Sequence, residues 1–186
     1  EGVLLRERGI SMPIVVLNAD ADSFDLMIAN RLEPEIYSFH SLRDFADAVT
    51  HAGELRYPIH LKLDTGMHRL GFMEEEIPAL CERLQGMSEV KVATIFSHLN
   101  CADMPEEDTY TRAQIERFDR MSTALIEALP YPVIRHTANS AAIERFPEAQ
   151  FDMCRLGLGL YGFGWQHNAA LRPVATLKTR IVQIKH

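Results

Sequence analysis

The chain has 186 residues, of which 47% are hydrophobic and 24% charged, with a formal net charge of −7 and a pI near 5.6. This length suffices for one substantial core, and the composition is that of an ordinary globular protein. No apolar run approaches the roughly 18 residues of a membrane span, and no signal peptide is apparent, so we expect no membrane partner. The acidic balance, without a basic stripe, also argues against nucleic acid as a partner.

The three cysteines, Cys81, Cys101 and Cys154, are odd in number and widely spaced. They match no disulfide or metal-ligand pattern, so we expect no metal site built on them. A reducing compartment is the simplest setting for such thiols. We therefore expect a cytoplasmic protein.

Strand and helix patterns alternate along the chain. A first helix is stopped by Gly9, and because nothing precedes it we expect the chain to begin inside a domain. The spacing predicts helices over 20–32, 41–53 with Ser41 as N-cap, 74–84 closed by Gly86, 108–129, and one starting at Asn139. Strands are predicted at 13–18, 35–39, 58–63, 90–98, 132–136 and 152–156. After several glycines, residues 171–184 become β-branched and alternating.

This succession of six strands, each followed by a helix or turn, indicates an α/β fold with a parallel sheet and right-handed crossovers. We expect a partial (β/α)8 TIM-like barrel with about six of its eight units. A doubly wound open sheet is the alternative. It is disfavoured because the glycine-rich dinucleotide fingerprint is missing after every predicted strand.

Residues 60–72 place charged groups where strand periodicity predicts a buried position. His60, Lys62 and Asp64 share one face of the strand, while Leu61 and Leu63 share the other. If helices cover the leucine face, Lys62 points at a core, where an ammonium must be paired, deprotonated or modified. A tight turn then brings Arg69 back over the strand end. The alternative is a surface strand with a solvated lysine.

Active sites of β/α barrels lie at the carboxyl ends of the strands, so the residues that leave each strand are the candidates. Asn139 and Ser140 open a helix whose free N–H groups favour an anion, and Gly157 follows the last predicted strand. The alternative is that these are plain helix caps and a turn residue. The full candidate set is Lys62, Asp64, Arg69, Ser97, His98, Asn100, His136, Asn139, Ser140, Arg155 and Gly157.

Four separated segments resemble the alanine racemase family in the same order, over essentially the whole chain: HLKLDTGMHRLGF at 60–72, Ser97-His98, HTANSAA at 136–142 and DMCRLGLGLYG at 152–162. The resemblance implies a cytoplasmic homodimer that binds pyridoxal 5′-phosphate (PLP) and interconverts L-alanine and D-alanine for peptidoglycan in the cell wall. Residues 1–165 would be part of its PLP-binding barrel, and 171–186 the start of a C-terminal β domain. Whether the parent protein is fused behind a cell-wall ligase stays open.

The resemblance also implies roles for single residues. Arg155 would face the PLP pyridine nitrogen, and because a guanidinium does not accept a proton, the ring would be a weaker electron sink that suits racemisation. His98 would lie near the ring, and Arg69 near the phenolic oxygen and the substrate carboxylate. Lys62 is a candidate for carbamylation, which would orient Arg69. The phosphate would be held by Asn139, Ser140, Gly157 and Leu158.

Two residues of the family's machinery have no counterpart here: the Schiff-base lysine of the first barrel strand and a tyrosine from the partner's C-terminal domain. The chain's lysines, Lys62, Lys91, Lys178 and Lys185, lie outside the Schiff-base motif. We therefore expect this chain by itself to be inactive and to hold PLP weakly. The alternatives are a non-catalytic single-domain PLP-binding barrel of the PLP homeostasis type, and a PLP-dependent decarboxylase, which is disfavoured because it would have an acidic group in place of Arg155.

Overall fold

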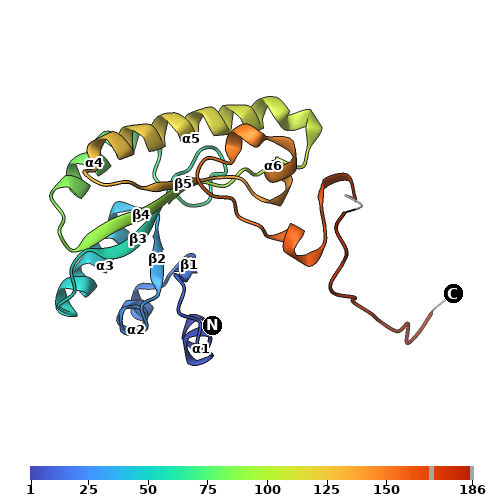
Figure 1. The fold of residues 1–186 in the computed structure, drawn as a ribbon, viewed down its shortest axis with the longest axis horizontal. Coiled ribbons are helices and arrows are strands. Elements are labelled where there is room, and N and C mark those ends of the chain that lie inside the picture. Colours follow the sequence, from blue (N-terminus) through green and yellow to red (C-terminus); the bar gives the residue numbers. More distant parts are fainter. Residues whose placement is uncertain (168–169, 185–186) are drawn as a thin grey trace.

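The computed structural model describes residues 1–167 and 170–184. Within them, five parallel strands form one sheet in the order β1-β2-β3-β4-β5, and the helices occupy the crossovers (Figure 1). Parallel strands that follow sequence order form a segment of a β/α barrel, as expected. The strands are β1 (Val15–Val16), β2 (Glu33–Ile36), β3 (Tyr57–Lys62), β4 (Val90–Phe96) and β5 (Ile134–His136). The helices are α1 (Gly2–Glu7), α2 (Phe24–Ala29), α3 (Phe39–His51), α4 (Ile77–Gln85), α5 (Asp108–Ala128) and α6 (Ser140–Arg145).

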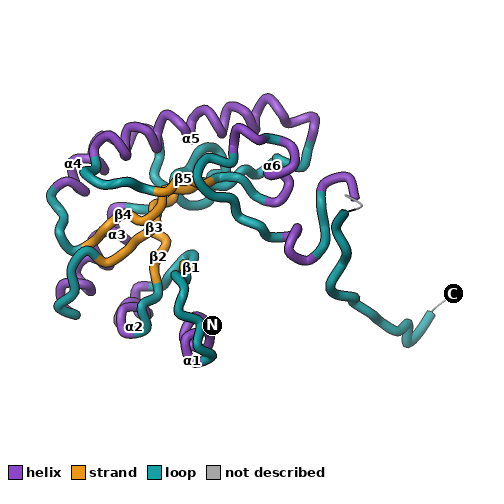
Figure 2. Tube along the Cα trace, viewed as in Figure 1, coloured by secondary structure: helices purple, strands orange, loops and turns teal. Residues whose placement is uncertain are grey.

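The two faces of the sheet differ in chemistry. One face packs against helices α2 to α5 and forms the main hydrophobic core; the longest of them, α5, runs along one side of the strands in Figure 2. Leu61 and Leu63 lie on this face and are almost fully buried, as the alternation predicts. The opposite face, which is the inner side of a barrel, carries buried polar groups: Glu35, His60, Lys62, Thr94 and His136.

The longest helix, α5, is amphipathic. Ile115, Phe118, Met121 and Leu125 are all buried, which confirms the apolar stripe predicted from their spacing. Burying such a stripe supplies most of the stability of a surface helix. None of the helices that the structure describes is long and apolar enough to cross a membrane.

A β-bulge in β4 changes which of its residues face inward. Ile59 pairs with Val92, but the next residue of β3, His60, pairs with Thr94, so Ala93 is left without a partner. One extra residue reverses the alternation of a strand. As a result, Val92 packs in the helix-facing core while Thr94 turns to the inner face beside His60.

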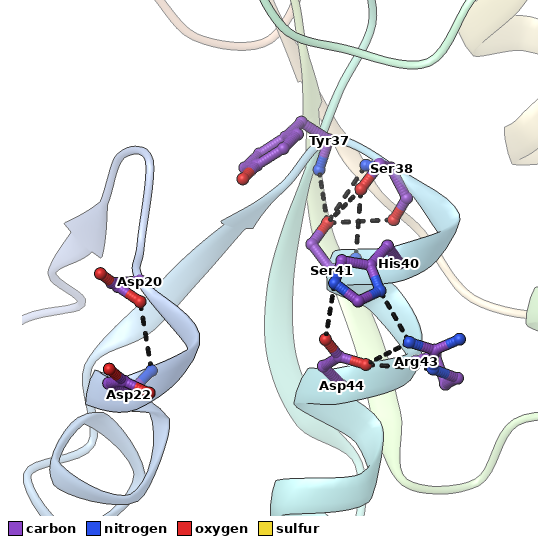
Figure 3. A network of polar contacts seen from close by, with 8 residues as sticks. All are labelled: Asp20, Asp22, Tyr37, Ser38, His40, Ser41, Arg43 and Asp44. Carbon is purple, nitrogen blue, oxygen red and sulfur yellow. Dashed lines mark hydrogen bonds and ion pairs between the residues drawn. The ribbon is translucent and has the colours of Figure 1, made fainter.

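Helix α3 begins earlier than predicted. Its N-cap is Ser38, not Ser41: the Ser38 hydroxyl accepts a hydrogen bond from the Ser41 N–H at 3.1 Å, and the Ser41 hydroxyl accepts one from the Ser38 N–H at 3.1 Å (Figure 3). This reciprocal capping box gives an acceptor to two backbone N–H groups at once, and a cap at Ser41 would leave both without one. The preceding strand is displaced with it, since β2 runs from Glu33 to Ile36 and Phe39 is already helical.

The predicted sixth strand at 152–156 is not formed, so the described residues hold five strands rather than six. Two backbone hydrogen bonds join this segment to the region of β5, from Asp152 N to Arg135 O and from Arg155 N to Ala138 O. Phe151, at φ of 45°, bends the chain immediately before it. The segment therefore lies beside β5 without a continuous ladder.

Residues 171–184 likewise contain no strand, although their composition is β-branched and alternating. They extend away from the sheet (Figure 1), and nearly all of their side chains are exposed. A strand needs a neighbouring strand to pair with, and sequence alternation does not supply one. That residues 171–186 open a second domain stays a prediction. The last two of them, 185 and 186, lie outside the residues that the structure describes.

Candidate active site

A cavity of about 820 Å³ lies at the carboxyl ends of β3, β4 and β5. This is the end of the strands where barrels place their active sites. Every residue to which the resemblance gave a role lines it: Lys62, Arg69, His98, Asn139, Ser140, Arg155, Gly157 and Leu158. The cavity is also lined by Phe96, Asn100 and Leu17. The structure thus brings together residues at or after the carboxyl ends of β1, β3, β4 and β5.

Arg69 reaches the cavity because the loop after β3 folds back on itself. The Asp64 carboxylate accepts a hydrogen bond from the Gly66 N–H at 2.9 Å, and the Asp64 N–H donates to the Phe72 carbonyl at 2.9 Å. Gly71 has a φ of 131°, and a Cβ there would lie 2.4 Å from the Asp64 nitrogen. Asp64 therefore shapes the turn and does not line the cavity.

Lys62 is buried and carries a partner that sequence reasoning missed. Its Nζ lies 2.7 Å from Glu35 Oε1, with side-chain exposures of 7% and 1%. The second oxygen of Glu35 accepts the Asn18 N–H at 2.6 Å, and the ammonium also lies over the Phe96 ring, 5.5 Å from its centroid. A buried ammonium with a carboxylate and an aromatic face is compensated. The expected burial of Lys62 is confirmed.

Arg155 is held by several acceptors at the ends of β4 and β5. One terminal nitrogen donates to His136 Nδ1 at 2.8 Å, and the other donates to the Ser97 carbonyl at 2.6 Å and the Thr137 carbonyl at 3.2 Å. His98 Nδ1 lies 3.5 Å from the second nitrogen. Among the described residues no partner is recorded for the Arg155 Nε–H, which leaves a donor for a group in the cavity.

Two histidines beside Arg155 are held neutral. Burial, followed by the positive charge of Arg155, lowers the pKa of His136 to about 3. Burial, then Arg155, Arg69 and Lys62, lowers the pKa of His98 to about 4. Burial also lowers the pKa of Arg155 to about 10, which leaves the guanidinium charged at neutral pH. The site therefore offers fixed positive charge and neutral imidazoles.

The side chain of Asn139 is occupied by the fold. Its Oδ1 caps α6 by accepting the Ala142 N–H at 3.0 Å, and its Nδ2 donates to the Leu99 carbonyl at 2.9 Å. The plain-cap interpretation is thus correct for this side chain. Any contact of Asn139 with an anion has to come from elsewhere than these two atoms.

Ser140 joins the two loops that the sequence paired as an anion site. Its hydroxyl oxygen accepts hydrogen bonds from the Gly157 N–H at 3.0 Å and the Gly159 N–H at 3.1 Å. Among the described residues no acceptor is recorded for the hydroxyl proton of Ser140. These contacts join the two loops at one end of the cavity, where the hydroxyl proton of Ser140 is left as a donor.

The donor set fits the cofactor that the resemblance implies. PLP has an anionic phosphate and a pyridine nitrogen that accepts a hydrogen bond. The Ser140 hydroxyl, at the end of the cavity where Gly157 also lies, supplies a donor suited to the first, and the Arg155 Nε–H is suited to the second. Among the described residues, no group of histidine, cysteine and carboxylate side chains is arranged to hold a metal ion.

The residues missed at the sequence level are Glu33 and Glu35 of β2 and Thr94 of β4. Glu33 Oε2 lies 2.8 Å from His60 Nε2, just as Glu35 pairs with Lys62. One signal was present, because Glu33 and Glu35 alternate with the same period as the two basic residues of β3. Thr94 carried no such signal, since the bulge sets its orientation.

Comparison with known proteins agrees with this geometry. Residues 1–164 match the family described as alanine racemase, N-terminal domain. The chain is 36% identical to the alanine racemase of Synechocystis sp. and 35% identical to that of Symbiobacterium thermophilum, in each case over 100% of this chain and 51% and 50% of the relative.

Solved structures give the same result. An alanine racemase of Clostridium difficile 630 in complex with cycloserine has a TM-score of 0.83 at 30% identity, over 92% of this chain and 48% of that one. The alanine racemase of Streptomyces lavendulae has a TM-score of 0.81 at 28% identity, over 92% and 47%. This chain therefore spans about half the length of the relatives it matches, and it belongs to the alanine racemase N-terminal domain family.

Proposed function

We propose that the protein carrying this chain is a PLP-dependent alanine racemase, an isomerase that interconverts L-alanine and D-alanine. The observation that carries the proposal is the position of Arg155, which lines the cavity and whose terminal nitrogens donate to protein acceptors, while its Nε–H has no partner among the described residues. The family membership and the four matching segments support it.

The residues of the chain would set the electronic character of the site. PLP, when bound, withdraws electrons from the bonds of the amino acid joined to it. Arg155 donates a hydrogen bond to the pyridine nitrogen without giving up its proton, which keeps that nitrogen unprotonated. His98, held neutral beside Arg155, adds no further positive charge. Weaker electron withdrawal limits side reactions, which favours racemisation over transamination.

The other cavity residues would orient the ligands. Ser140, Gly157 and Leu158 hold the phosphate end, together with the helix start at Asn139. Arg69 binds the substrate carboxylate, and Lys62 stands behind it as the candidate for carbamylation. These roles follow from the matching motifs and from the shared cavity. The Schiff-base lysine and the second acid–base group would come from segments beyond those matched here.

The wider setting is also part of the proposal. A homodimer in the cytoplasm, supplying D-alanine for peptidoglycan, is the assembly that the resemblance implies. The exposed apolar side chains of residues 171–184 suit a segment that packs on something further, as a C-terminal β domain would provide.

The test uses the full-length protein that carries this chain, with PLP and L-alanine, and measures D-alanine over time. Arg155→Lys keeps a charge but loses the fork of hydrogen bonds, so we expect turnover to fall roughly 10²-fold, as for other lost electrostatic contacts. Arg112→Lys, on the exposed side of α5, is the matched control and should keep full activity. A wild-type protein that binds PLP but produces no D-alanine would overturn the proposal in favour of a non-catalytic PLP carrier.

A further inference from the structure

A continuous chain of hydrogen bonds crosses the inner face of the sheet from Arg155 to Glu33. Arg155 contacts His136 Nδ1 at 2.8 Å, and His136 Nε2 lies 3.0 Å from the Thr94 hydroxyl. That hydroxyl lies 2.8 Å from His60 Nδ1, and His60 Nε2 lies 2.8 Å from Glu33 Oε2. One residue comes from each of the strands β2 to β5, and Arg155 closes the series.

The two end residues, Arg155 and Glu33, determine which atom donates and which accepts in every hydrogen bond of this series. A guanidinium only donates, so His136 Nδ1 must accept and the ring proton must sit on Nε2. His136 then donates to the Thr94 oxygen. The Thr94 hydroxyl proton is left to donate to His60 Nδ1, which places the His60 proton on Nε2, facing the Glu33 carboxylate.

A protonated His60 would break this order. Its Nδ1 would then donate to the Thr94 oxygen, which already receives the proton of His136, and the Thr94 hydroxyl proton would lose its acceptor. The neutral arrangement satisfies every group between the two ends. Burial, then Arg155 and His60, lowers the pKa of His136 to about 3, which agrees with a neutral His136 ring in this series.

This series of hydrogen bonds lies in a nearly dry part of the molecule. His60, Thr94 and His136 are each 4–6% exposed, and the Glu33 side chain is 13% exposed. Water has little access to replace a lost partner, so each bond depends on its neighbour. The ring of His136 is also held flat against Phe96, with ring centroids 5.0 Å apart and planes within 2°.

We propose that Glu33, His60 and Thr94 are positioning residues that, together with the donor from Arg155, hold His136 in its Nε2–H tautomer and thereby help to fix the orientation of the Arg155 guanidinium. None of the three lines the cavity, and they act through His136. The consequence for the cofactor rests on the proposed function, whereas the tautomer lock depends only on the geometry. Thr94 is the central member, because its hydroxyl alone both accepts from one ring and donates to the other.

The experiment removes the hydroxyl of Thr94 in the full-length protein. Thr94→Val keeps the shape but leaves His136 Nε2–H without an acceptor and His60 Nδ1 without a donor. Ring ¹⁵N chemical shifts of the two histidines, measured without PLP, report the tautomers directly. We expect single Nε2–H tautomers in the wild type and mixed ones in Thr94→Val, while Thr94→Ser restores the wild-type shifts.

The matched control is Thr111→Val. Thr111 is fully buried on α5, and among the described residues its hydroxyl has no hydrogen-bond partner, so its loss should leave both rings unchanged. At the other end, Glu33→Gln keeps an acceptor for His60 Nε2–H and should preserve the His60 tautomer, whereas Glu33→Leu should not.

Turnover gives a second and separate readout. In the PLP-loaded enzyme, Thr94→Val should lower kcat up to about tenfold, the effect of about one net hydrogen bond, with KM for alanine little changed. Ring shifts of Thr94→Val identical to the wild type would overturn the inference, whatever the activity. A wild type without racemase activity would instead contradict the proposed function and leave the ¹⁵N result to decide the tautomer lock.

Discussion

Lys62 Nζ lies 2.7 Å from Glu35 Oε1 on the buried inner face of the sheet, and among the described residues neither forms a salt bridge with any other residue. The two residues are 27 positions apart and come from neighbouring strands. Two charges removed from water are tolerated only as a pair with good geometry. The pair therefore accounts for a lysine at a position where strand alternation requires burial.

Glu35→Gln should destabilise the full-length protein markedly. The substitution keeps the shape and one oxygen but leaves the Lys62 ammonium buried without its counter-charge, which costs about 3 kcal/mol of unfolding free energy. Urea denaturation of the two proteins measures the difference. Glu74→Gln is the control: Glu74 pairs with Arg120 at the exposed surface, and its loss should cost less than about 1 kcal/mol.

Carbamylation of Lys62 should depend on the same carboxylate. A carbamate forms on an uncharged amine, and Glu35 stabilises the charged ammonium while repelling a new anion. We expect intact-mass spectra in bicarbonate buffer to show more carbamylated protein for Glu35→Gln than for the wild type. Lys91→Arg, which removes an ordinary lysine of β4, should not alter the difference. Complete carbamylation of the wild type would contradict this expectation.

Gly71→Ala should disturb the loop that carries Arg69. Gly71 combines a φ of 131° with a space where a Cβ would lie 2.4 Å from the Asp64 nitrogen. Gly53 has a φ of 72° but open space around it, so Gly53→Ala isolates the backbone strain. We expect Gly53→Ala to cost about 1 kcal/mol and Gly71→Ala about 3, measured from thermal unfolding. Equal losses would mean that the close approach to Asp64 does not constrain the loop.

Acidification should destabilise the fold through His136. Its folded pKa is about 3, because of burial and then Arg155 and His60, whereas an unfolded histidine titrates near 6.5. Between these values the unfolded chain binds a proton that the folded chain does not, so stability is complete above pH 6.5 and falls toward pH 3. At pH 5 the loss from this residue is about 2 kcal/mol.

An NMR titration of the His136 ring tests the cause of that loss. The ring should stay neutral down to about pH 4, while urea midpoints fall between pH 7 and pH 5. His51→Gln, which removes an exposed histidine at the end of α3, should leave the fall in midpoint unchanged. Protonation of His136 near pH 6.5 would contradict the assignment.

Much of the fold followed from local patterns. The amphipathic period of α5, the leucine face of β3 and the residues leaving each strand could be read from the sequence, since side-chain direction repeats within a single element. The cavity residues Lys62, Arg69, Ser140 and Arg155 were identified for the same reason. Lys62 ends β3, Arg69 and Ser140 follow β3 and β5, and the carboxyl ends of parallel strands meet at one edge of the sheet, whereas Arg155 was placed from a predicted strand that does not form.

Only the tertiary structure decided the features that arise where one strand pairs with a neighbouring strand. The bulge at Ala93 brings Thr94 beside His60, and the register of β2 against β3 brings Glu33 and Glu35 to their basic partners. The alternation of one strand does not specify how it pairs with the next. For the same reason, residues 152–156 and 171–184 look like strands in the sequence yet form none, because a strand exists only where another chain segment supplies its hydrogen bonds.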